Sequence, residues 1–115
     1  MTNTQIMKNI EFSKALRLED LIDYQEGQIV SKTIAQLPGV SVTLFSLAKG
    51  EGISTHTTSG DAMVQVLDGE AEITIGGEVV TVKAGETVIM PADVPHGLEA
   101  RERFKMLLTV IKKPV

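Results

Sequence analysis

The two histidines of the chain, His56 and His96, are the side chains best suited to chemistry at neutral pH. An imidazole can ligate a divalent metal ion, or it can act as a general acid or base. It can equally be a neutral, hydrogen-bonded residue that lines a polar pocket. The chain has no cysteine, which excludes disulfides, thiolate metal ligands and a cysteine nucleophile.

Each histidine lies in a segment with regularly placed glycines. The first segment, 50–69, reads GEGISTHTTSGDAMVQVLDG, and the second, 85–100, reads GETVIMPADVPHGLEA. Their spacing resembles the two motifs of the cupin superfamily, G-x5-H-x-H-x3-E-x6-G and G-x5-P-x-G-x2-H-x3-N. The matching positions are Gly50, His56 and Gly69 in the first motif and Gly85, Pro91 and His96 in the second.

The resemblance implies a jelly-roll β-barrel in which His56 and His96 face one shared pocket. In cupins, two histidines and a glutamate of the first motif and the histidine of the second hold a divalent metal ion. Here Thr58 and Ala62 stand in the places of the second histidine and the glutamate. Asp93 and Ala100 replace the glycine and asparagine of the second motif. The resemblance therefore implies a reduced metal site for Zn, Ni, Fe or Mn, with His56 and His96 as metal ligands and the Thr58 hydroxyl as a further ligand-binding group.

Asp61 is the carboxylate nearest in sequence to the empty glutamate position. Consecutive side chains on a strand point to opposite faces, so Asp61 reaches inward only if the Ser59–Asp61 turn has not yet become strand. Aspartate in a turn also stabilises the turn through its own backbone. Both interpretations stay open. Tyr24 lies outside both motifs and receives no role.

The elements that must position these residues are short strands, because Gly, Pro and Asp interrupt β-branched runs at close intervals. Only residues 13–24 indicate helix, at most as a short helical turn. We expect one all-β cupin domain over 1–115, with an N-terminal arm at about 1–26 and a barrel at about 27–112. The predicted strands are 27–36, 41–48, 53–57, 62–67, 70–76, 78–83, 86–90, 96–100 and 104–112.

Two of these strands, 41–48 and 104–112, are apolar on both faces. In the second, Phe104 and Met106 share one face while Leu107 and Ile111 lie on the other. A strand of this kind is covered on both sides. We expect a homodimer that buries these strands and the N-terminal segment. The alternative is that residues 10–24 fold back over the outer face.

Charge and hydropathy limit the partners. The formal net charge is -4 and the basic residues form no stripe, so no nucleic-acid partner is expected. The longest nearly apolar stretch, 106–111, is far too short to span a bilayer. Residues 1–10 lack the pattern of a signal peptide, and a cytoplasmic location is the resulting default.

These observations predict a small-molecule-binding cupin with a reduced metal site and a ligand that the sequence does not identify. The missing histidine and glutamate favour binding over catalysis, because catalytic zinc sites usually have three protein ligands. The alternative is a metal-dependent oxygenase or isomerase of a small organic acid, phenol or sugar, with His56, His96 and water around the metal. A purely structural dimerisation module would not need both histidines on one pocket.

Overall fold

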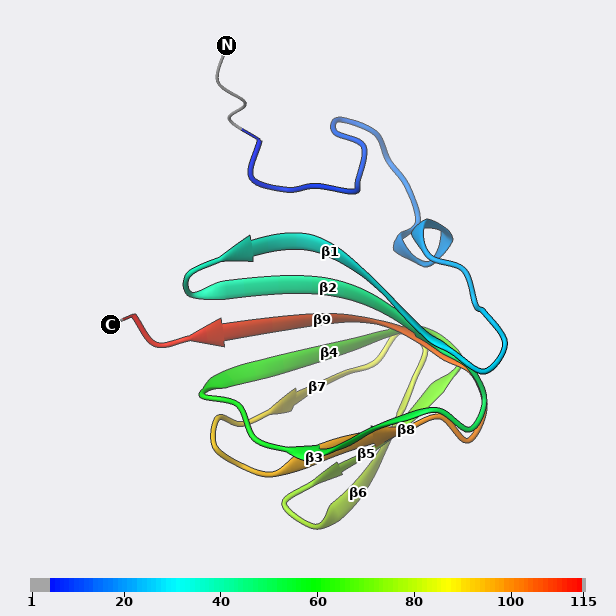
Figure 1. Cartoon of the computed structure of the whole chain (residues 1–115), viewed down its shortest axis with the longest axis vertical. Helices are drawn as coiled ribbons and strands as arrows, with labels where there is room; N and C mark the ends of the chain where they lie inside the picture. The colour runs from blue at the N-terminus through cyan, green and yellow to red at the C-terminus, as the bar shows by residue number, and fades with distance from the viewer. Residues whose placement is uncertain (1–4, 115) are drawn as a thin grey trace.

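The computed structural model describes residues 5–114, which fold into two facing antiparallel sheets (Figure 1). One sheet has the order β1-β2-β9-β4-β7 and the other β3-β8-β5-β6. The strands are β1 (Ile29–Leu37), β2 (Val40–Leu47), β3 (Gly52–His56), β4 (Gly60–Asp68), β5 (Glu70–Ile75), β6 (Glu78–Lys83), β7 (Thr87–Met90), β8 (His96–Glu99) and β9 (Phe104–Lys112). All nine predicted strands are confirmed, with ends that differ by at most two residues. The short helical turn is the 3-10 helix η1 (Leu18–Leu21).

The hydrophobic core lies between the two sheets and follows strand alternation. On β4, Ala62, Val64 and Val66 are buried. Ala71 and Ile73 of β5 face them from the other sheet and belong to the same core cluster. The cluster is completed by Leu47, Val82, Met90, Leu98, Ala100, Phe104 and Met106. Aliphatic side chains therefore fill most of the interior, as the scarcity of aromatic residues requires.

A second apolar cluster lies on the outer face of the five-stranded sheet. We call residues 18–24 the strap; they cross this face, and their Ile22 side chain is buried there. Leu44 of β2 and Leu107 of β9 are among the sheet residues beneath it. Of the two covers expected for the doubly apolar strands, the fold-back of residues 10–24 is therefore present in the chain itself. Ile111, at the end of β9, remains 56% exposed.

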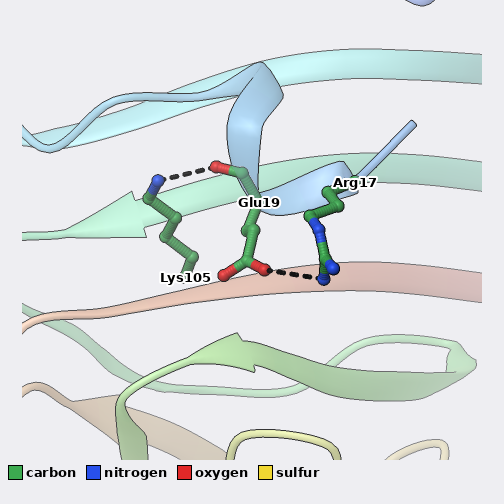
Figure 2. A network of polar contacts seen from close by, with 3 residues as sticks. All are labelled: Arg17, Glu19 and Lys105. Carbon is green, nitrogen blue, oxygen red and sulfur yellow. Dashed lines mark hydrogen bonds and ion pairs between the residues drawn. The ribbon is translucent and has the colours of Figure 1, made fainter.

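Polar side chains tie the strap to four neighbouring strands. Lys32 of β1 donates a hydrogen bond to the Leu21 carbonyl, and the buried Ser46 hydroxyl of β2 donates to the Asp23 carbonyl at 2.8 Å. Figure 2 shows Lys105 of β9, whose ammonium group donates to the Glu19 carbonyl at 2.6 Å. The Glu19 carboxylate in turn lies 4.0 Å from Arg17.

The fourth tie is Tyr24, whose hydroxyl donates to the Asp68 carboxylate of β4 at 2.5 Å. Arg103 and Lys105 lie 4.3 and 4.9 Å from the centre of the tyrosine ring, within the range of cation–π attraction. Burial raises the pKa of the Tyr24 hydroxyl above its ordinary value of about 10, and Asp68 raises this pKa further. Tyr24 therefore has a structural role, as the anchor of the strap.

The tyrosine can be followed without a label, because it is the only one in the chain. We expect the phenolate absorbance of the folded protein to appear at higher pH than that of the urea-unfolded protein. The folded state then retains a proton that the unfolded state has lost, so the free energy of unfolding falls as pH rises above about 10. Tyr24→Phe should lack this component of the pH dependence. Coincident titration of the folded and unfolded forms would contradict the assigned contacts.

Within residues 5–114, no helix has the length and apolar character needed to cross a membrane.

Candidate functional site

The structure brings His56 and His96 together. His56 is the last residue of β3 and His96 the first of β8, and the two are direct partners in the antiparallel pair. Their ring centroids lie 4.5 Å apart with an angle of 67° between the ring planes. Two imidazoles from separate motifs therefore meet edge to face at one end of the four-stranded sheet.

Strand alternation alone does not place His56 on this face. Ile53 pairs with Leu98, and both pack against the core. Three residues further along β3, regular alternation would turn His56 outward. The register shifts between Ile53 and His56, so that β3 takes three steps where β8 takes two. This β-bulge returns His56 to the face of His96.

Backbone carbonyls fix the orientation of both rings. The Nδ1 atom of His56 lies 2.8 Å from the Ser54 carbonyl oxygen, and that of His96 lies 3.0 Å from the Val94 carbonyl oxygen. A carbonyl oxygen only accepts hydrogen bonds, so each Nδ1 carries the proton and donates. In the neutral rings the lone pair is then on Nε2, as in histidines that bind metal ions through Nε2.

The two rings differ in their access to solvent. His96 is only 2% exposed, whereas His56 is an exposed residue. His96 sits beside Ile75 of β5 in the sheet register, and Ile75 packs against the core. A ligand from solvent would therefore meet His56 first and His96 behind it.

Thr58, in the turn after β3, and Asp61, at the start of β4, both make defined hydrogen bonds. The Thr58 hydroxyl donates a hydrogen bond to the Gly60 carbonyl at 2.8 Å, which leaves its oxygen lone pairs as the groups that can still bind. The Asp61 carboxylate accepts a hydrogen bond from the Ala92 N–H at 2.8 Å. Because β4 begins at Gly60, Asp61 already lies in a strand and is exposed, and its carboxylate joins that strand to the loop that leads to His96.

The other positions where the chain departs from the cupin motifs are also defined. Ala62 and Ala100 are buried in the core, at 1% and 0% exposure, with Ala62 paired to Met90 of β7. Asp93 adopts a left-handed backbone with φ of 63°, a conformation in which glycine is free of strain. In the described part of the chain, no group of three or more His, Cys, Asp or Glu side chains could hold a metal ion.

Two backbone carbonyl groups of the site could not be predicted from residue types. The Ser54 and Val94 carbonyls act through the backbone, so their side chains carry no signal of the role. In each motif the carbonyl lies two residues before the histidine, which is a repeated geometry that the sequence does not reveal. The β-bulge is likewise absent from the motif spacing.

Comparison with known proteins bears directly on this arrangement. A model of the cupin domain matches residues 43–112, which include β3, β8 and both histidines. The chain belongs to the cupin family. A search of the curated proteins finds no match to this cupin.

Several similar proteins have solved structures, and the names of the following three state no specific activity. A conserved protein of unknown function from Streptococcus pyogenes is 42% identical over 99% of this chain and 100% of its own, with a TM-score of 0.95. A cupin superfamily protein from Desulfitobacterium hafniense is 33% identical over 93% and 98% of the two chains, with a TM-score of 0.89. A Cupin 2 conserved barrel domain protein from Leptotrichia buccalis is 44% identical over 84% of this chain and 47% of its own, with a TM-score of 0.83.

Proposed function

We propose that this cupin binds a small molecule at a reduced, two-histidine metal site. The single observation that carries the proposal is the pair of Nδ1–carbonyl hydrogen bonds, which directs both Nε2 lone pairs away from the backbone. Two imidazoles held in this way are suitable donors for Zn, Ni, Fe or Mn. The remaining coordination positions would be filled by water or by the ligand itself.

The donor set favours a binding role over an enzymatic one. Ala62 has no donor atom, and the Thr58 hydroxyl proton is engaged with Gly60. A bound metal ion would act as a Lewis acid for an oxygen or nitrogen atom of the ligand. The chain's own contribution is to hold two imidazoles in fixed tautomers, with His96 buried and His56 at the entrance. The Thr58 oxygen is available to accept a hydrogen bond from the ligand.

A zinc titration of tag-free protein tests the proposal. We expect one Zn²⁺ per chain in the parent, and at least about tenfold weaker binding in His56→Ala and in His96→Gln, since each change removes one of two protein donors. Glutamine keeps most of the buried volume at position 96. Ser54→Ala is the matched control, because it alters the side chain but leaves the carbonyl that orients His56. Equal zinc affinity in all four proteins would refute the site.

We also propose that the protein is a homodimer whose interface includes residues 5–16 of the N-terminal arm. The arm extends beyond the edge strand β1 (Figure 1), where the Lys8 N–H and the Asn9 side-chain amide donate to β1 carbonyls. Ile6 and Phe12 are 64% and 48% exposed on this arm. The radius of gyration, 14.5 Å, exceeds the roughly 13 Å of a compact chain of about this length. An extended arm with exposed apolar side chains is well suited to pack on a second copy.

Sedimentation at micromolar concentration tests the dimer. We expect the parent to sediment as a dimer and Phe12→Asp with Ile111→Asp to sediment as a monomer, because a charge buried without a partner is costly. Val79→Asp is the control, since Val79 is an apolar residue on β6 of the other sheet that is at least as exposed as Phe12 and Ile111. A monomeric parent would rule out the proposal.

A further inference from the structure

The β-bulge that turns His56 inward depends on space above β8. Between the pairs Ile53–Leu98 and His56–His96, residues Ser54 and Thr55 of β3 stand opposite Gly97 alone. Gly97 is itself buried in the sheet, between His96 and Leu98. The extra residue of β3 must therefore be accommodated over a position that has no side chain.

The atoms of the bulge occupy the place where a side chain at position 97 would be. A Cβ atom built on Gly97 would lie 3.1 Å from the Ile53 carbonyl oxygen. It would lie 3.2 Å from both the Thr55 nitrogen and the Thr55 hydroxyl oxygen. Two of these three neighbours are backbone atoms, so a rotamer change cannot relieve the crowding. Gly97 has no positive φ, and glycine is required here for space rather than for backbone conformation.

The crowded segment also contains the carbonyl that orients His56. Ser54 lies between Ile53 and Thr55, and its carbonyl oxygen accepts the Nδ1 proton of His56. The corresponding carbonyl for His96 belongs to Val94, before β8, and is not in the bulge. A displacement of the bulge would therefore disturb one imidazole and leave the other in place.

We infer that Gly97 is a positioning residue for the two-histidine site. Because Gly97 has no side chain, β3 can bulge over β8, and this bulge aims His56 at His96 and fixes the tautomer of His56. The inference rests on the proposed metal-binding function. It predicts an asymmetric effect, because a methyl group at position 97 pushes Ile53 and Thr55, the residues on either side of Ser54, but not Val94.

The test compares Gly97→Ala with the parent and with Gly39→Ala. Gly39 is a matched control, because its φ is not positive and a Cβ there would meet the Lys112 carbonyl oxygen at an ordinary 3.7 Å. Zinc affinity is measured by competition titration, and the ring nitrogens of both histidines are observed by NMR in metal-free protein. The ring nitrogens report the tautomer directly, which a purely structural role for Gly97 would not change at His56 alone.

We expect Gly97→Ala to fold, to bind zinc roughly tenfold more weakly, and to lose the Nδ1–H tautomer at His56 while His96 keeps it. Gly39→Ala should behave as the parent does. Unchanged zinc affinity and unchanged His56 signals would overturn the inference, as would an equal disturbance of both histidines.

Two further arms keep the test decisive. If Gly97→Ala does not fold, the same change is made in a Thr55→Gly background, which removes the crowding hydroxyl but keeps both backbone neighbours, and is compared with Thr55→Gly alone. If the parent binds no zinc, the proposed function fails. The ring-nitrogen signals of the metal-free proteins then still decide whether Gly97 positions His56.

Discussion

Thr58→His combined with Ala62→Glu is expected to raise the affinity for Zn²⁺ or Ni²⁺ at least about tenfold, a change of about 1.4 kcal/mol. The two substitutions restore the imidazole and the carboxylate at the spacing of the cupin motif. Ala62 is on the inner face and 1% exposed, so the new glutamate begins from a buried position. Each added donor would replace a water molecule on the metal at little cost in chain entropy.

The same variant should be less stable than the parent without metal, and the metal should restore its stability. An ionised carboxylate at a buried position with no partner is unfavourable, and a metal ion that binds only the folded state raises its free energy of unfolding. Thermal unfolding with and without zinc measures this difference. Thr58→His with Ala62→Gln is the control, because the amide has similar size but no charge. A double variant that folds but gains no affinity would show that positions 58 and 62 do not face the histidines.

Gly69→Ala is expected to destabilise the fold severely. Gly69 carries the chain from β4 in one sheet to β5 in the other, with φ of 75°. A Cβ atom there would lie 2.3 Å from the Arg103 carbonyl oxygen, which is too close for any relaxation of a side chain to relieve. Alanine at this position therefore combines backbone strain with a collision against the backbone of a neighbouring segment.

Gly85→Ala separates these two effects. Gly85 has a φ of 89°, but nothing lies within 4 Å of a Cβ atom built there. We expect this control to lose about 1–2 kcal/mol from strain alone, and Gly69→Ala to lose at least about 2 kcal/mol more. Chemical denaturation of both variants provides the comparison. An equal loss of unfolding free energy in the two variants would mean that the backbone near Arg103 moves at little cost to accommodate the new methyl group.

Strand positions could be predicted from the sequence because the turns are marked by glycine, proline and aspartate, whereas the strands are β-branched. The alternation of Ala71, Ile73 and Ile75 was likewise sufficient to orient β5. The cover of the outer sheet was harder to predict. From the sequence we expected a second subunit over Leu107, with a fold-back of residues 10–24 as the alternative, and the structure shows Ile22 packed in the same cluster as Leu107. The strap is recognisable only through tertiary contacts, such as the hydrogen bond from the Ser46 hydroxyl to the Asp23 carbonyl.

The candidate site was predictable in its side chains but not in its geometry. The motif spacing indicated that His56 and His96 belong together, and their rings do meet. Asp61 was harder to interpret, because it could serve as a ligand or as a turn residue. In the structure it is an exposed residue of β4 whose carboxylate accepts a hydrogen bond from the Ala92 N–H. The β-bulge and the carbonyl groups that orient the histidines depend on how two strands align, and that alignment could not be predicted from one sequence.

The strap also bears on how the strands find their alignment. A one-residue slip between strands exchanges inner and outer faces, and a strand with one apolar face resists this because its polar face would be buried. β2 and β9 carry apolar side chains on both faces, so burial alone penalises such a slip less than it would in a strand with one wholly polar face. Ser46 and Lys105 are partners in the register, and both point their polar atoms at the strap. A slip would break both of these hydrogen bonds and bury polar atoms without partners. The strap therefore stabilises the native register of two strands whose hydrophobic pattern does not specify it.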